Sequence, residues 1–271
     1  MRQLAADFRD ESDALHALVE PLSAKDMQRP TAFKQWTPDM ILRHLHVWNL
    51  AAGMSLAGDG SFQTYYAALS EHLKGGGAFP VFEEAWLDGL SGPDLVAVWR
   101  DGCRTLADSY AEAQPSARVK WAGPDMSVRS SLTARLMETW AHGQAIYDLL
   151  GVVRENRDRI RNIVVLGYNT YAWSFRVHGR EPPTPQPQLI LSAPSGEIWT
   201  FGEPNALERI EGPAEAFCQV VTQTRNVADT DLATTGPNAA AWMEIAQCFA
   251  GAPVLPPAPG LRRTGASGAP A

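Results

Sequence analysis

The chain has 271 residues and a formal net charge of −7, with 45% hydrophobic and 20% charged residues. This composition supplies a sizeable core, and the negative charge argues against a protein that binds a nucleic-acid backbone. Three widely separated cysteines without a CxxC pair exclude a cysteine-rich zinc module and indicate a reducing compartment. The lack of a signal-peptide pattern and of a long apolar run predicts a cytoplasmic protein without a membrane span.

The first 180 residues read as a series of helices. Apolar residues near the 3.6-residue period predict a helix over residues 2–22, followed by a loop over 25–35. Thr37 and Pro38 are typical of an N-cap and a first helical position, so a second helix is expected from there to Ala57. The remaining expected helices span 62–74, 93–112, 127 or 130 to 150, and 157–173, with a short extended piece over 119–123.

The composition changes at residues 182–187, where prolines dominate and predict an extended linker. Strands are expected at 188–192 and 198–201 around a Pro-Ser-Gly turn, and helices at 214–224 and 238–249. We therefore predict a mainly α protein in which a helical bundle over residues 1–180 precedes a small α+β domain over 181–255. Residues 256–271 are rich in Pro, Gly and Ala and are expected to form a disordered tail.

Three side chains from two of the predicted helices are candidate metal ligands. Glu138 and His142 are four residues apart, which places both on one face of a helix. Such a pair alone is typical of a surface ion pair. His44 on the second helix completes a set of two histidines and one glutamate, which leaves a zinc-type ion with an open position. His46, two residues farther on, points away from the face of His44.

The motifs around these residues resemble the DinB-like superfamily, in particular the branch of mycothiol-dependent maleylpyruvate isomerases. One motif runs from Trp36 to His44-Leu45, and the other consists of Glu138, His142, Asp148 and Leu150-Gly151. Sequences beyond the bundle, such as 191–199, 212–223 and 246–251, are similar to the C-terminal domain of an actinobacterial subgroup of metal-binding proteins. The resemblance therefore extends over nearly the whole chain and implies a four-helix bundle followed by a small α+β domain.

The resemblance also implies a chemistry. A zinc-like divalent metal would be held by His44, Glu138 and His142, and the thiol mycothiol would bind at its open position. A free thiol has a pKa of about 8.5, and coordination to a dication removes its proton. The expected function is that of an S-transferase or isomerase acting on a small electrophilic metabolite, with natural-product biosynthesis as its expected context. Independently of the resemblance, Arg225 is a candidate for binding a substrate carboxylate bidentately, through two guanidinium N–H groups.

Three positions depart from the pattern of the subgroup and keep other functions open. Ala145 replaces an acidic residue, Asn162 replaces a histidine, and Thr224 interrupts a Gln-Arg-Arg run. One alternative is a metal-dependent hydrolase or lyase in which water replaces the thiol. Another is a cyclase without metal that uses His142 or Glu138 as general base, and a third is a non-catalytic small-molecule-binding protein. The expected partners are a small substrate and a thiol, with no nucleic acid or membrane, for a monomer or homodimer.

Overall fold

The computed structural model describes residues 1–263 and divides into two compact units. The first unit consists of Met1–Leu149, and the second begins at Leu150. The sequence placed this division at residue 180, at the start of the proline-rich segment. Of the predicted tail, residues 264–271 lie outside the described part of the chain.

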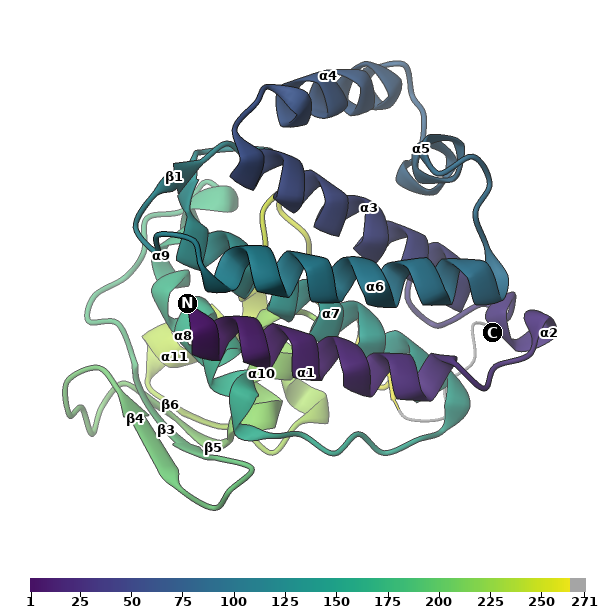
Figure 1. Ribbon diagram of the computed structural model, residues 1–271. Coiled ribbons are helices and arrows are strands. Elements are labelled where there is room, and N and C mark those ends of the chain that lie inside the picture. Colours follow the sequence, from purple (N-terminus) through teal and green to yellow (C-terminus); the bar gives the residue numbers. More distant parts are fainter. Residues whose placement is uncertain (264–271) are drawn as a thin grey trace. The chain divides into compact units, whose positions relative to one another are not determined.

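Long helices form a bundle in the first unit. They are α1 (Arg2–Val19), α3 (Pro38–Ala57), α6 (Gly92–Ala111) and α7 (Val128–Leu150). Helix α6 packs against both α1 and α3, as Figure 1 shows. Helix α7 is joined to α6 by a hydrogen bond of 2.9 Å between the Tyr110 and Ser131 hydroxyls. The predicted helical bundle is therefore confirmed.

The ends of these helices follow the expected capping chemistry. The hydroxyl of Thr37 accepts a hydrogen bond from the Met40 amide at 3.3 Å, and Gly58 ends α3 in the left-handed conformation. Ser127 accepts from the Ser130 amide at 3.1 Å at the start of α7. Gly151 follows the last residue of α7 with a φ of 69°. The two helices that carry the candidate ligands thus begin and end where the sequence indicates.

The bundle core is built from large apolar side chains repeated every three or four residues. Leu95, Trp99 and Leu106 line the buried face of α6. The other helices contribute the fully buried side chains Phe8, Leu15, Ile41, Leu42, Leu132, Leu136 and Trp140. This apolar stripe on each helix is what drives the helices together, because each buried Leu or Phe contributes roughly 2 kcal/mol.

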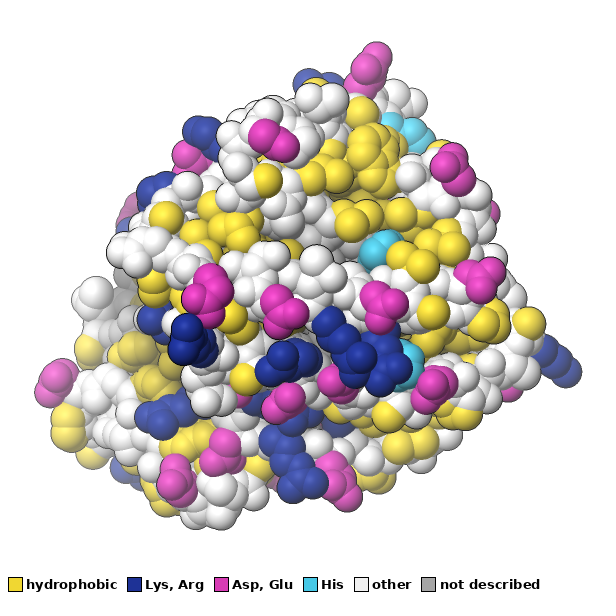
Figure 2. Space-filling model, in the orientation of Figure 1, with side chains coloured by type: hydrophobic (Ala, Val, Ile, Leu, Met, Phe, Trp, Pro, Cys, Tyr) yellow, Lys and Arg dark blue, Asp and Glu magenta, His cyan; other side chains and the backbone are white. Residues whose placement is uncertain are grey.

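Three shorter helices accompany the bundle: α2 (Ala24–Met27), α4 (Ser61–Lys74) and α5 (Phe79–Trp86). Helices α4 and α5 pack against α3 through an aromatic cluster that includes Trp48, Phe62 and Tyr65. Figure 2 shows hydrophobic side chains gathered over this region and a band of charged side chains over α1 and α6. The sequence did not predict α2 or α5, because each is shorter than three turns and has too few residues to establish a period.

A mixed sheet and helices make up the second unit. The strands β3 (Gln188–Ser192), β4 (Ile198–Phe201), β5 (Arg209–Pro213) and β6 (Ala233–Thr235) are arranged in the order β4-β3-β5-β6. Strand β3 is antiparallel to β4 and parallel to β5. Helix α10 (Ala214–Val221) packs on β3 and β5, and α11 (Pro237–Ile245) packs on α9 (Tyr171–Val177). These elements form the small α+β part that the sequence predicted.

Two features of this unit differ from expectation. The helix expected over residues 157–173 is divided into a short 3-10 turn (Asp158–Ile160), α8 (Arg161–Asn169) and α9, with the break at Thr170. The proline-rich segment is bonded to its own unit, because Pro183 accepts from the Tyr171 hydroxyl at 2.7 Å and Pro185 from Asn238 at 2.9 Å. It therefore lies inside the second unit.

None of the helices in the described residues is sufficiently long and apolar to cross a membrane.

Candidate metal centre

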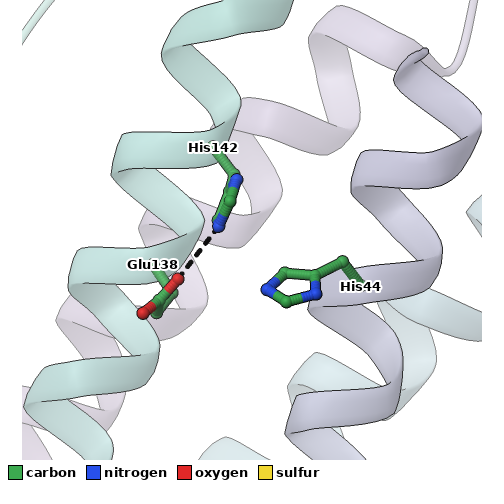
Figure 3. A group of neighbouring side chains, drawn as sticks. All are labelled: His44, Glu138 and His142. Carbon is green, nitrogen blue, oxygen red and sulfur yellow. Dashed lines mark ion pairs between the residues drawn. The ribbon is translucent and has the colours of Figure 1, made fainter. Parts of the chain in front are cut away.

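His44, Glu138 and His142 lie together in the first unit. One donor atom from each lies within 4.8 Å of the others. Figure 3 shows the two α7 side chains facing His44 on α3. In a search of the described residues for three His, Cys, Asp or Glu side chains close enough to hold a metal ion, these three form the group that is found. The structure therefore brings together the three residues that the sequence singled out.

Glu138 and His142 form the closest pair of the three. Oε2 of Glu138 lies 3.0 Å from Nε2 of His142. Burial raises the pKa of Glu138, but the His142 hydrogen bond and nearby positive charge outweigh it and lower the pKa to about 2. Burial also lowers the pKa of His142, against the opposing effect of Glu138. At neutral pH the carboxylate is ionised and the imidazole is neutral, which are the protonation states that metal ligands require.

A fourth side chain, Glu83 on α5, orients His44. Oε1 of Glu83 lies 2.6 Å from Nδ1 of His44, and the Glu83 side chain is almost fully buried. With Nδ1 engaged there, Nε2 is the ring nitrogen of His44 that remains for a ligand. A carboxylate on the far nitrogen of a ligating histidine fixes the ring and raises its basicity. Sequence reasoning missed Glu83, although two adjacent acidic residues, Glu83 and Glu84, inside the otherwise apolar run Phe79–Trp86 were a signal for it.

Aromatic rings enclose the two histidines. Trp36 stacks on His142 with ring centres 5.9 Å apart, and Phe33 contacts the same imidazole edge-on at 5.1 Å. Trp48 and Phe79 each have ring centres 6.2 Å from that of His44. These rings hold the imidazoles in place and reduce the access of water to the site, which strengthens electrostatic interactions there.

The segment that carries Phe33 and Trp36 has an unusual backbone. Lys34 and Gln35, between them, adopt positive φ values of 51° and 60°. Left-handed conformations are disfavoured for residues with a side chain and persist where the surroundings over-determine them. The Thr31 amide donates to the Trp36 carbonyl at 2.9 Å and closes the segment into a tight loop. This strained loop brings both rings against His142.

His46 lies apart from the triad, as the sequence predicted. Its side chain is buried, and burial lowers its pKa to about 4. Its ring approaches the position of Gly102 on α6, where a Cβ atom would lie 3.1 Å from it. His46 is therefore a packing residue between α3 and α6.

Arg225 belongs to the second unit, where it follows α10. Its side chain is buried, and Nη1 donates to the carbonyl of Thr224 at 2.9 Å. Thr224 itself donates its hydroxyl to the Gln219 carbonyl at 3.2 Å, and Asn162 donates to the Arg159 carbonyl at 3.0 Å. Ala145 is in the first unit, on α7, one turn beyond His142. The role of Arg225 toward a substrate stays a prediction.

The donor set fits a divalent ion of the zinc type. Two imidazole nitrogens and one carboxylate oxygen are the ligands of catalytic zinc sites with an open position. Tetrahedral zinc with bonds of about 2.0–2.1 Å places its ligand atoms roughly 3.3 Å apart. The 3.0 Å between Glu138 and His142 is close to this value, and all three donors lie within 4.8 Å. Small side-chain movements therefore suffice to bring the third ligand into reach.

Comparisons with known proteins agree with this architecture. Residues 8–147 match the mycothiol maleylpyruvate isomerase N-terminal domain. An uncharacterized protein of Mycobacterium tuberculosis, found in two strains, is 36% identical over 92% of this chain and 95% of its own length.

Solved structures give the same result for the fold. The chain is similar to the crystal structure of the mycothiol-dependent maleylpyruvate isomerase. The match covers 80% of this chain and 87% of the chain in that structure, with a TM-score of 0.51 and 14% identity. A histidine-to-alanine variant of that enzyme matches equally well. Since the domain match spans more than half of the chain and includes all three candidate ligands, the chain belongs to the mycothiol maleylpyruvate isomerase family, within the DinB-like superfamily.

Proposed function

We propose that the protein is a metal-dependent enzyme that uses the low-molecular-weight thiol mycothiol. It acts on a small electrophilic metabolite, either as an isomerase or as an S-transferase that joins the thiol to the metabolite. His44, Glu138 and His142 are the proposed metal ligands, with zinc as the metal. The observation that carries the proposal is the convergence of their donor atoms within 4.8 Å on two facing helices. Membership of a family named for a mycothiol-dependent isomerase supports the choice of thiol.

A divalent ion held by His44, Glu138 and His142 would lower the pKa of a thiol at its open position and so would supply a thiolate at neutral pH. The protein provides the surroundings that this chemistry needs. The ionised Glu138 would offset part of the positive charge of the ion, and Glu83 holds the proton on Nδ1 of His44, which keeps Nε2 available. The rings of Trp36, Phe33 and Phe79 limit water that would compete for the same position.

Metal content tests the first half of the proposal. Elemental analysis of the purified protein is expected to give one divalent ion per chain, and His44→Ala and His142→Ala are expected to lose it. His72→Gln is the matched control, because His72 lies on α4 and contacts Phe82 and the Ala78 carbonyl but not the triad. Full metal content in both alanine variants would contradict the assignment of the ligands.

Thiol dependence tests the second half. Binding of mycothiol to the zinc-loaded protein is measured by calorimetry and compared with binding to protein treated with a chelator. We expect binding only with the metal present, and turnover of electrophilic substrates only with the thiol present. Turnover that proceeds equally without thiol would instead indicate a metal-dependent hydrolase or lyase.

A further inference from the structure

Helix α5 brings Glu83 to His44, although it has little packing of its own. It is eight residues long, and Glu83 is the buried residue among them, whereas Val81 and Trp86 are exposed. An isolated helix of this length is unstable in water, so contacts from outside must hold it. Apolar contacts are non-directional and do not by themselves fix a hydrogen bond of 2.6 Å. The position of Glu83 therefore depends on how the ends of α5 are held.

A buried ion pair on α3 holds the connection between α5 and α6, whose course is visible in Figure 1. Nε of Arg43 donates to the Leu90 carbonyl at 2.9 Å. Oδ1 of Asp39 accepts from the Gly92 amide, also at 2.9 Å. The two buried side chains bind each other, because Nη2 of Arg43 donates to Oδ2 of Asp39 at 3.0 Å. Leu90 and Gly92 are thus fastened to the helix that carries His44.

The carboxylate of Asp39 lies at the N-termini of two helices. Asp39 is in the first turn of α3, and it binds the first amide of α6. Ser91, which precedes α6, makes no side-chain cap, so Asp39 supplies one. The amides at a helix N-terminus carry partial positive charge and favour a carboxylate. Gln28 adds a hydrogen bond of 3.1 Å to Oδ2, so both oxygens are bonded and the geometry is well defined.

The connection itself is a tight turn. Asp88, Gly89 and Gly92 have positive φ values of 49°, 76° and 60°. Such a conformation is disfavoured for a residue with a side chain, as at Asp88. The Gly89 amide donates to the carbonyl of Glu84 on α5 at 2.9 Å. Because the turn is bonded to the last turn of α5, holding Leu90 also holds that helix.

We propose that Asp39 and Arg43 are positioning residues of the metal centre, because they fasten the connection between α5 and α6 to α3 and so keep Glu83 on Nδ1 of His44. This inference rests on the proposed function, since it concerns the orientation of a proposed metal ligand. Glu84 also lies 3.7 Å from Arg43, but its side chain is exposed. Exposed ion pairs contribute little, so Glu84 is not part of this tether.

The first test observes the bond between Glu83 and His44 in the metal-free protein. The Nδ1 proton of His44 lies in a short hydrogen bond to a carboxylate and should give a downfield NMR signal in protein with isotope-labelled histidine. Its absence in His44→Gln assigns it. We expect the signal to persist in Glu84→Gln and to move upfield or disappear in Arg43→Met and Asp39→Asn. No such signal in the wild type, or an unchanged signal in both variants, would overturn the proposal.

Two further variants address the stability of the fold. A single substitution leaves the other charge buried without its ion-pair partner, which is destabilising, whereas Asp39→Asn combined with Arg43→Met removes both charges. Arg43→Lys keeps the ion pair but loses the donor to Leu90, so it should shift the His44 signal partway. In both, hydrogen exchange should become at least about tenfold faster over residues 79–86 and stay unchanged over 128–150. Equal acceleration in the two segments would identify a general structural role and refute the proposal.

Zinc affinity tests whether the effect passes through Glu83. Arg43→Met should bind zinc about tenfold more weakly than the wild type, which is the lower end of the effect of losing a partner to a ligating histidine. In a Glu83→Ala background the same substitution should have no further effect, because His44 has already lost that partner. A further decrease of the same size in that background would show that Arg43 acts by another route and would contradict the proposal.

These measurements separate the failure of this inference from the failure of the proposed function. If the wild type binds no zinc but its His44 signal responds to Arg43→Met, the metal-dependent function fails and the tether stands. If the wild type binds zinc but the His44 signal does not respond, the tether fails and the metal assignment stands.

Discussion

The hydrogen bond between Glu83 and His44 has a measurable consequence for metal affinity. In Glu83→Gln the amide oxygen still accepts from Nδ1 of His44, but without the negative charge that strengthens the 2.6 Å contact. Loss of such a partner to a ligating histidine lowers metal affinity about 10- to 100-fold, or about 1.4–2.8 kcal/mol. Because the amide retains one hydrogen bond, we expect a decrease near the lower end, about tenfold.

The same substitution should leave the metal-free fold as stable as before or more so. Oε2 of Glu83 is buried and has no hydrogen-bond partner among the described residues, so the carboxylate is incompletely paired. Affinity is measured by competition with a chromophoric chelator, and stability by thermal unfolding in EDTA. A decrease in affinity without a decrease in stability would distinguish a role in orienting His44 from a role in packing.

Glu84→Gln is the control for this experiment. Glu84 neighbours Glu83 on α5 but points to solvent, with its side chain 58% exposed and 3.7 Å from Arg43. We expect its metal affinity to equal that of the wild type. If Glu83→Gln also binds zinc as tightly as the wild type, then Glu83 does not orient His44 and the reasoning is refuted.

Three other substitutions and treatments have defined outcomes. Burial lowers the pKa of His46 from 6.5 to about 4, so below pH 6.5 the unfolded chain gains a proton that the folded chain does not. The wild type should therefore lose about 3 kcal/mol of stability between pH 6.5 and 4 that His46→Gln does not lose, as chemical denaturation across this range would show. Thr37→Ala removes the N-cap of α3 and should reduce the free energy of unfolding by about 1 kcal/mol in urea; an unchanged midpoint would contradict the capping role. Cys103 is buried, which raises the pKa of its thiol to about 12, so iodoacetamide at pH 8 should label it only in denatured protein; rapid labelling of the native protein would show that the α6 core opens.

The bundle was predictable because its helices carry strong local signals. The Thr37-Pro38 start and Gly58 stop fix α3, and Ser127 and Gly151 fix α7. Their apolar stripes also repeat over several turns, which is the condition under which periodicity is informative. The strands β3 and β4 were predicted at their observed bounds because β-branched and aromatic residues flank a clear turn.

The features that escaped prediction depend on tertiary contacts. Strand β6 has only three residues and is defined by its pairing with β5, which no local pattern reveals. The 3-10 turn and the break at Thr170 interrupt a sequence that is helical by composition alone. The division of the chain at Leu150 reflects the packing of α8 and α9 with α10 and α11, which sequence composition does not show.

The candidate site was predictable only in part. His44, Glu138 and His142 could be identified by spacing and motif, because metal ligands must be particular residue types. Glu83 was missed, since it acts through His44, which is distant in sequence, and the adjacent pair Glu83 and Glu84 does not by itself show which carboxylate is buried. Such roles depend on burial and on missing partners, which only the folded chain reveals.

X-ray absorption spectroscopy at the zinc edge would test the proposed centre most directly. In the zinc-loaded protein alone, we expect two imidazole ligands and otherwise oxygen neighbours, from His44, His142, Glu138 and solvent. After addition of mycothiol, a sulfur neighbour should appear at about 2.3 Å. A sulfur neighbour before mycothiol is added, or a spectrum without imidazole scattering or unchanged by the thiol, would contradict the proposed metal centre and its use of a thiol.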